Sequence, residues 1–223
     1  MYHYVSDPFI TADRLRRDLS VSPDAFAEQL RFLHDNGYTT ISLDALHAFL
    51  SRGEALPPKA VVLTFDDGHI DHYDTVFPLL KQYGMTATFF VVADYATFSY
   101  TNPAYMSWAQ IREMSEAGMS IESHGRTHRE LRDRSFQFLV WEVLGPIEQI
   151  EAYTGKRPHF FCYPVGRYDP AVIRMLKSVQ TLAAVTTEYG AEHSLANAFT
   201  WKRLRMRNST TISQFESMLS LAQ

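Results

Sequence analysis

Two adjacent acidic residues, Asp66 and Asp67, follow an apolar run of strand length and precede a glycine in the segment VVLTFDDG. The run from Val61 to Phe65 is rich in β-branched and aromatic residues, which predicts a buried strand. Neighbouring side chains on a strand point to opposite sides, so both carboxylates can face one site only if the chain turns there, which Gly68 permits. Such a pair could bind a metal ion or accept a proton. Alternatively, Asp67 could cap a following helix.

A second polar segment, Ser-His-Gly-Arg-Thr-His, places His124 and His128 four residues apart, directly after a predicted strand at residues 119–123. On a helix or in a tight turn, both imidazoles would lie on one side and could hold one metal ion. Histidine pairs with this spacing also occur on protein surfaces, and the Glu of a metalloprotease His-Glu-x-x-His helix is absent. Together with Asp66 and Asp67, however, the pair offers two nitrogen ligands, one oxygen ligand and a spare carboxylate. This set is typical of an open catalytic metal site.

The elements that must position these residues alternate between strands and helices along the chain. Such alternation predicts parallel strands joined by right-handed crossovers, in either a doubly wound sheet or a barrel. The Gly-x-Gly-x-x-Gly motif of a nucleotide-binding sheet is absent after the first strand. Because the candidate residues follow several different strands, we expect an α/β fold that is a distorted β/α barrel of seven or eight parallel strands. Its site should lie at the C-terminal strand ends.

The predicted strands are residues 2–5, 39–43, 61–65, 86–92, 119–123, 160–163, 182–186 and 204–206. Residues 135–153 show a helical pattern that Gly145-Pro146 should kink or split. Residues 93–106 are expected to form a loop rich in aromatic side chains. Without repeats or linkers, residues 1–223 are expected to form a single domain.

Composition narrows the class of protein. The 223 residues carry a net charge of −4, and 46% of them are hydrophobic. We expect neither a membrane span nor a nucleic-acid partner, because no apolar run approaches ~20 residues and no basic cluster is interleaved with aromatics. A single cysteine leaves no intrachain disulfide. The opening Met-Tyr-His-Tyr-Val lacks the features of a secretory signal, so we expect either a cytoplasmic protein or a leader outside this sequence. Compartment and oligomeric state stay open.

The ordered motifs TFDDG, SHGRTH and FCYPVG resemble those of the polysaccharide deacetylase family, also called carbohydrate esterase family 4 or the nodulation-deacetylase homology domain. The resemblance extends over nearly the whole chain, and the opening Tyr-His-Tyr-Val is similar to a branch that includes poly-N-acetylglucosamine deacetylases. It implies that Asp67, His124 and His128 bind a divalent metal, usually zinc, with cobalt, nickel or iron as alternatives. It also implies that Asp66 is the general base.

The same resemblance implies an oxyanion and substrate-binding site in the turn formed by Tyr163, Pro164, Val165 and Gly166. Pro164 has no N–H, so the donor to the oxyanion is expected at Val165 or a neighbour.

Two departures from the family pattern affect the expected site. Cys162 stands where many members have an Arg beside the base, and Arg203 or Arg205 is the expected replacement, the alternative being a solvated charge. The family's late Leu-x-His is also missing. We expect His3 to supply the general acid, because its strand would lie next to the last strand in a closed barrel. Imidazole, which ordinarily titrates near 6.5, is suited to donate a proton near neutrality. A structural role for His3 is the alternative.

The expected activity is removal of N-acetyl groups from glycans that contain N-acetylglucosamine, with release of acetate. The alternatives are an O-acetyl xylan esterase, a small-amide deacylase, or a glycan-binding relative with weakened catalysis, suggested by the missing Arg and His. His69 and His72 are expected at the rim or surface. The aromatic residues of the 93–106 loop could stack on sugar rings or pack as a lid.

Overall fold

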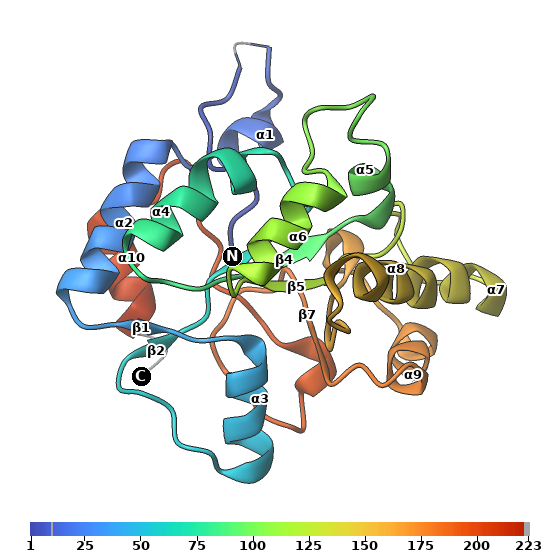
Figure 1. The fold of residues 1–223 in the computed structure, drawn as a ribbon. Coiled ribbons are helices and arrows are strands. Elements are labelled where there is room, and N and C mark those ends of the chain that lie inside the picture. Colours follow the sequence, from blue (N-terminus) through green and yellow to red (C-terminus); the bar gives the residue numbers. More distant parts are fainter. Residues whose placement is uncertain (10, 221–223) are drawn as a thin grey trace.

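The structure, a computed structural model, describes residues 1–9 and 11–220. At its centre lies a curled parallel sheet (Figure 1). It has five strands in the order β3-β4-β5-β6-β7. Its strands are β3 (Thr64–Phe65), β4 (Thr88–Val91), β5 (Ser120–Ser123), β6 (Phe160–Cys162) and β7 (Ala183–Val185). A separate two-stranded parallel sheet pairs β1 (Thr39–Thr40) with β2 (Ala60–Val61). The parallel α/β architecture expected from the alternation is confirmed.

Helices cover the outside of the sheet (Figure 1). They are α1 (Arg14–Asp18), α2 (Pro23–Asp35), α3 (Leu43–Arg52), α4 (Phe77–Gln82), α5 (Ala93–Thr97), α6 (Trp108–Glu116), α7 (Phe136–Leu139), α8 (Gly145–Thr154), α9 (Pro170–Ser178) and α10 (Ile212–Ser220). Their starts follow the capping rules, since Ser22, Ser107 and Asp169 each accept a hydrogen bond from a backbone N–H of the first turn. Among the described residues, we find no helix with the length and apolarity needed to cross a bilayer.

Two short extended segments join the edges of the sheet. The backbone of Tyr2 donates to Thr64 at 2.8 Å and accepts from Asp66 at 3.0 Å, which places the amino end beside β3. The backbone of Trp201 exchanges hydrogen bonds of 3.0 and 2.9 Å with Ala184 and Thr186 beside β7. The Met1 amino group then donates to the carbonyl of Leu204 at 2.8 Å, and Met206 N–H donates to the Met1 carbonyl at 3.0 Å. The amino-terminal segment therefore lies next to the last extended segment, as predicted, and the barrel closes.

The count and length of the barrel strands differ from the prediction. The segments at residues 2–5 and 204–206 are extended but contact their neighbours through isolated bridges and single hydrogen bonds, not through ladders. The predicted strand at 39–43 is only two residues long and belongs to the separate sheet. Residues 93–97 form the short helix α5, so the predicted 93–106 loop begins later. Apolar composition marks an extended, buried segment, but it does not show how many ladder hydrogen bonds that segment makes.

The predicted kink at Gly145-Pro146 takes the form of a π-turn. Residues Val140–Leu144 adopt π-helical hydrogen bonding between α7 and α8, and the N–H of Gly145 bonds to the carbonyl of Val140. Pro146 lacks an N–H, so the α-helical partner of the Glu142 carbonyl is missing and wider spacing is tolerated. A second π-turn, His72–Val76, precedes Pro78 in the same way.

A stack of aromatic rings supports the end of β3. Phe65 stacks on Tyr2 and on Phe89 of β4, each at a centroid distance of 5.0 Å, and Phe26 of α2 packs edge-on against both Tyr2 and Phe65. All four side chains are buried. Burying a large aromatic side chain stabilises the fold by roughly 1.5 to 3 kcal/mol. The stack thus fixes the strand end from which the two acidic residues emerge.

Candidate active site

The acidic pair lies at the end of β3, where the chain turns through two successive left-handed residues. Asp67 has φ +76° and Gly68 has φ +75°. Asp is one of the few non-glycine residues that tolerate this conformation. Gly68 also packs against β4, because a Cβ placed there would lie 3.5 Å from Val91. The turn lets both carboxylates face the carboxyl ends of the strands.

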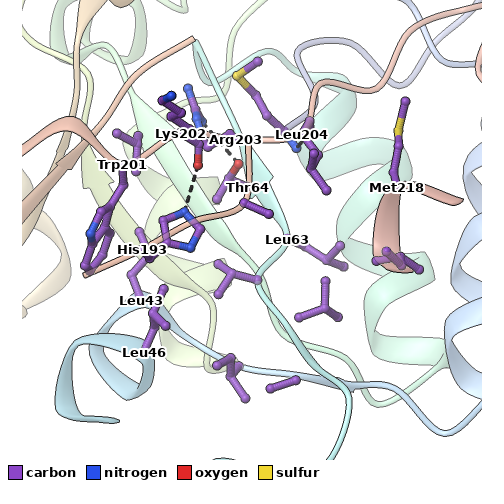
Figure 2. Close-up of a pocket in the computed structure, with 18 of the residues that line it drawn as sticks. Leu43, Leu46, Leu63, Thr64, His193, Trp201, Lys202, Arg203, Leu204 and Met218 are labelled. Atoms are coloured by element: carbon purple, nitrogen blue, oxygen red, sulfur yellow. Dashed lines mark hydrogen bonds between the residues drawn. The ribbon is translucent and has the colours of Figure 1, made fainter. Parts of the chain in front are cut away.

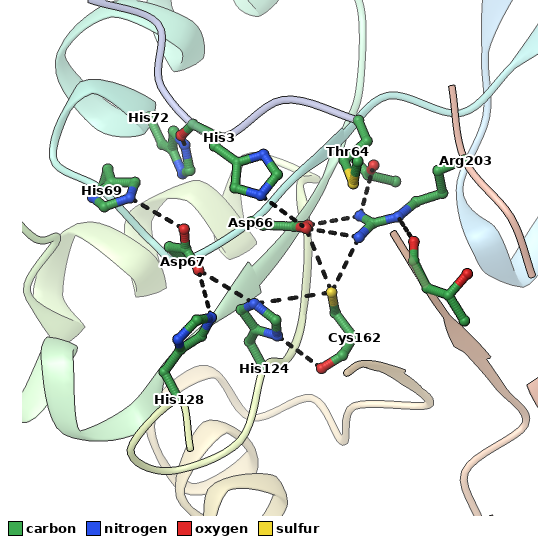
Figure 3. A network of polar contacts seen from close by, with 12 residues as sticks. His3, Thr64, Asp66, Asp67, His69, His72, His124, His128, Cys162 and Arg203 are labelled. Carbon is green, nitrogen blue, oxygen red and sulfur yellow. Dashed lines mark hydrogen bonds and ion pairs between the residues drawn. The ribbon is translucent and has the colours of Figure 1, made fainter. Parts of the chain in front are cut away.

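Asp67, His124 and His128 converge on one point (Figure 3). Oδ1 of Asp67 lies 3.2 Å from Nε2 of His124 and 3.2 Å from Nε2 of His128. Nδ1 of His124 lies 2.7 Å from the carbonyl of Cys162, to which it can only donate, so Nε2 is free to act as a ligand. Although burial opposes it, the imidazoles of His124, His128 and His69 beside Asp67 hold the pKa of this carboxyl well below its ordinary value. The carboxylate is therefore anionic.

This group fits a divalent cation. Oδ1 of Asp67 is buried and has no hydrogen bond of acceptable geometry, although two imidazole nitrogens lie near it. One ligand atom from each of the three residues falls within 4.8 Å of the others. Two nitrogens and one oxygen around an unsatisfied anionic atom are a suitable set for zinc or a similar ion with further positions open.

Asp66 forms a buried ion pair with Arg203, which comes from the segment that closes the barrel (Figure 3). Nη1 and Nη2 of Arg203 donate to Oδ1 and Oδ2 of Asp66, both at 2.7 Å. The guanidinium is fixed further by Nε–H donation to the Thr186 carbonyl at 3.0 Å. Burial disfavours the charged carboxylate, but the Arg203 charge and hydrogen bonds hold the pKa of Asp66 below its ordinary range. Asp66 is thus an ionised, oriented acceptor.

Cys162 and Arg203 occupy neighbouring positions behind Asp66. The thiol lies 3.5 Å from Oδ2 of Asp66 and 3.2 Å from Nη2 of Arg203. The small side chain at position 162 leaves space for a guanidinium that arrives from another part of the chain. Of the two arginines considered from the sequence, Arg203 takes the place beside the acid. Arg205 instead lines the cavity in front of it.

His3 lies on the other side of Asp66. Its Nε2 is 3.9 Å from Oδ2 of Asp66, and its backbone carbonyl accepts a hydrogen bond from Nε2 of His72 at 2.7 Å. Burial lowers the pKa of His3 to about 4, against the opposing charges of Asp66 and Asp67. Burial thus moves the titration of His3 below the ordinary value near 6.5, which favours the neutral ring at pH 7.

The candidate residues share one cavity of about 370 Å³. Its lining includes His3, Asp66, Asp67, His124, His128, Tyr163, Val165 and Arg205, and a wall contributed by Asp13, Leu15, Arg16 and Leu19. Val165 has φ +53° and is half exposed in the turn after β6. Tyr163 is buried and its hydroxyl donates to the Phe199 carbonyl at 3.0 Å. Arg203 does not line this cavity; it is buried behind Asp66, in the place that the sequence offered to Arg203 or Arg205.

A second cavity of about 460 Å³ has Arg203, but not Asp66, in its lining (Figure 2). Its walls are mainly apolar and include Leu43, Leu46, Leu63, Trp201, Leu204 and Met218. It contains none of the acidic or metal-ligating residues described above, so we place the chemistry in the smaller cavity.

Two histidines expected at the rim or surface, His69 and His72, are instead buried beside the site. Nε2 of His69 lies 3.3 Å from Oδ2 of Asp67, and its ring stacks between Tyr4 at 4.0 Å and Tyr105 at 5.1 Å. His72 is fully buried and holds the His3 backbone. The available signal was their closeness to Gly68 in the sequence, since His69 directly follows this glycine and His72 begins the π-turn that comes next.

The aromatic residues after β4 divide into two groups. Tyr95 and Tyr105 pack against each other at 4.2 Å beside His69 and His128, as a lid would. Phe98 and Tyr100 are exposed. Tyr95 and Tyr105 are therefore packed side chains, whereas Phe98 and Tyr100 are exposed to solvent.

A parallel sheet that carries an Asp-Asp pair and two histidines at its carboxyl edge defines a hydrolase-like site on a distorted barrel. A sequence model described as polysaccharide deacetylase matches residues 53–184. The chain therefore belongs to the polysaccharide deacetylase family, carbohydrate esterase family 4, as the motifs predicted.

Individual relatives agree with this assignment. YxkH of Bacillus subtilis (strain 168), whose name places it among polysaccharide deacetylases, is 30% identical over 96% of this chain and 73% of its own length. The poly-β-1,6-N-acetyl-D-glucosamine N-deacetylase of Escherichia coli (strain K12) is 25% identical over all of this chain, which spans 38% of that enzyme. The Streptococcus pyogenes deacetylase PplD, solved in complex with acetate, superposes with a TM-score of 0.88 and 28% identity, covering 98% of this chain and 94% of that one.

Proposed function

We propose that this protein is a metal-dependent hydrolase that removes N-acetyl groups from glycans containing N-acetylglucosamine and releases acetate, with residues 1–223 acting as one catalytic domain. The observation that carries the proposal is the convergence of Asp67, His124 and His128 beside an ionised Asp66 in one cavity. The names of the relatives support a glycan as the partner. The weakened-relative alternative loses its main support, because Arg203 occupies the place beside Asp66.

In this proposal Asp67, His124 and His128 hold the metal, with zinc as the first candidate. The bound ion would polarise the acetamide carbonyl and make a water molecule more acidic. Asp66 accepts the proton of the attacking water, and Arg203 keeps this carboxylate ionised and correctly turned. The N–H of Val165 or a neighbour in the Tyr163–Gly166 turn would donate to the developing oxyanion. Arg205 would contact the substrate from the cavity wall.

His3 would return the proton to the leaving nitrogen. Since the ring is neutral at pH 7, it must first receive a proton before it can donate one. Nε2 of His3 lies 3.9 Å from Oδ2 of Asp66, so the proton taken from water can pass from Asp66 to His3 after a small movement. The C–N bond then breaks as the nitrogen is protonated, giving an amine and acetic acid, which ionises to acetate by releasing its proton to solvent. One proton taken from water balances the one delivered to nitrogen.

We expect His3→Gln to lower turnover by about 10²- to 10⁴-fold, because Gln keeps a similar volume but cannot carry the proton. Metal content should not change, since His3 is outside the ligand set. Turnover of acetylated oligosaccharide and metal analysis of the same sample test this. A folded, metal-loaded variant with turnover within a few-fold of the parent would leave His3 with only a structural role.

Acetate release tests the proposed function. The metal-loaded protein is incubated with β-1,6-linked N-acetylglucosamine oligomers, chitooligosaccharides, acetylated xylan and a small acetamide, each with and without chelator. Metal-dependent acetate from an N-acetylglucosamine substrate supports the proposal. Release only from xylan or only from the small amide would assign one of the alternative activities, and glycan binding without acetate release would assign a binding protein.

A further inference from the structure

Glu142 is a buried carboxylate that touches none of the proposed reacting groups. It lies in the π-turn Val140–Leu144 and is completely excluded from solvent. Its Oε2 accepts hydrogen bonds from the backbone N–H groups of Arg126 at 2.9 Å and Thr127 at 3.0 Å, and its Oε1 accepts from the Thr127 hydroxyl. All three donors belong to the loop between His124 and His128. A buried carboxylate is costly unless its oxygens are satisfied, and here the loop supplies the donors.

The π-turn brings Glu142 against the loop. Gly125, at φ +79°, allows this approach, because a Cβ there would lie 3.3 Å from Oε2 and 3.6 Å from the backbone carbonyl of Glu142. A larger residue at position 125 would separate the two elements. The same carbonyl lacks the α-helical donor that Pro146 removes. The wide turn, the proline and the glycine therefore combine to place one carboxylate on the loop's N–H groups.

The opposite side of the loop is held by the start of α5. The N–H of Ala93 donates to the Gly125 carbonyl at 3.1 Å, and the N–H of Asp94 donates to the Arg126 carbonyl at 2.9 Å. The loop's carbonyls are thus fixed by α5, while its N–H groups are fixed by Glu142. Removing Glu142 would release one side and leave two backbone donors unsatisfied.

His128 depends on this loop more than His124 does. Nδ1 of His124 is held by the Cys162 carbonyl at 2.7 Å. His128 has the left-handed φ of +60°, its ring contacts Asp67 through Nε2, and within the described part of the chain no hydrogen bond holds its Nδ1. Apart from ring contacts with His124 and Tyr95, the direction of the His128 ring is therefore set by its backbone.

We propose that Glu142 is a positioning residue that fixes the 124–128 loop and so directs His128 toward the metal. The inference rests on the proposed function, because it assumes that His128 is a ligand. Groups that orient ligands indirectly commonly change metal affinity by about 10- to 100-fold when they are replaced. Glu142 would do so through two backbone N–H groups and one hydroxyl.

The test compares Glu142→Gln, Glu142→Ala and the control Glu148→Gln, an exposed acid on α8. Zinc affinity is measured by competition with a chelating dye, and the coordination of cobalt is followed by its visible spectrum. We expect a Kd increase of about 10-fold for Gln and up to about 100-fold for Ala, with an altered cobalt spectrum. The control should match the parent. If Glu142→Ala does not fold, the zinc Kd of Glu142→Gln alone tests the proposal.

Two outcomes separate this inference from the proposed function. A parent protein that binds less than one equivalent of zinc or cobalt would contradict the metal site itself, and the inference with it. A parent that binds one equivalent, with Glu142 variants of equal affinity but lower Tm, would show that Glu142 is merely structural. A double variant tests whether Glu142 acts through His128. Adding Glu142→Gln to His128→Ala should change the zinc Kd by less than about twofold. A full 10-fold effect there would exclude action through His128.

Discussion

Replacing Asp66 by Asn is expected to lower turnover by about 10²- to 10⁴-fold while the metal stays bound. Asn retains the size of Asp66 but cannot accept the proton of the attacking water. The three proposed ligands are other residues, so metal affinity should change little. Turnover of acetylated oligosaccharide, measured together with metal content by elemental analysis, checks both parts.

The matched comparison is Asp67→Asn, which removes the anionic ligand and should lose metal and activity together. Equal loss of metal in both variants would show that the roles of Asp66 and Asp67 have been divided incorrectly. Activity of Asp66→Asn near that of the parent would exclude Asp66 as the base.

Replacing Arg203 by Met is expected to destabilise the protein by about 3 to 5 kcal/mol at neutral pH, because it leaves the buried Asp66 carboxylate without its partner. Both side chains are almost completely excluded from solvent. In the parent, Arg203 lowers the pKa of Asp66, so this pair contributes stability above the ordinary pKa and loses it as pH falls through the folded value. Urea unfolding at several pH values measures the effect.

In Arg203→Met, the titration of Asp66 should change stability with pH in the opposite direction. Without Arg203, burial raises the pKa of Asp66, so the variant is most stable when Asp66 is protonated and loses stability as pH rises through the raised pKa. Arg205→Met, which changes a partly exposed neighbour on the cavity wall, is the control and should unfold nearly as the parent does. A loss for Arg203→Met that is small and independent of pH would contradict the role of the ion pair.

Local sequence signals were sufficient for the strand ends and for the residues that converge there. These signals are the TFDDG turn, the spacing of His124 and His128, and the alternation of strands and helices. The structure places Asp66, Asp67, His124 and His128 in one cavity. The pairing of Arg203 with Asp66 required the barrel to be closed, since 137 residues separate them. The sequence could only offer Arg203 and Arg205 as candidates.

Other features depend on tertiary contacts that have no local signal. His69 is buried because Tyr4 and Tyr105 stack on it from distant segments. The lowered pKa of His3 results from burial inside the closed barrel, which composition cannot report. Glu142 did have a signal, a single acid within the apolar run FLVWEVL, but the reason for that acid lies in a loop 15 residues earlier.

Metal content tests the central claim most directly. The parent, His128→Ala and the exposed-site control His34→Ala are purified, loaded with zinc, freed of excess ion and measured by elemental analysis. We predict about one equivalent of zinc in the parent and the control, and a large loss of both zinc and acetate release in His128→Ala, because one of three protein ligands is removed. Full zinc content in His128→Ala, or no stoichiometric metal in an active parent, would contradict the account.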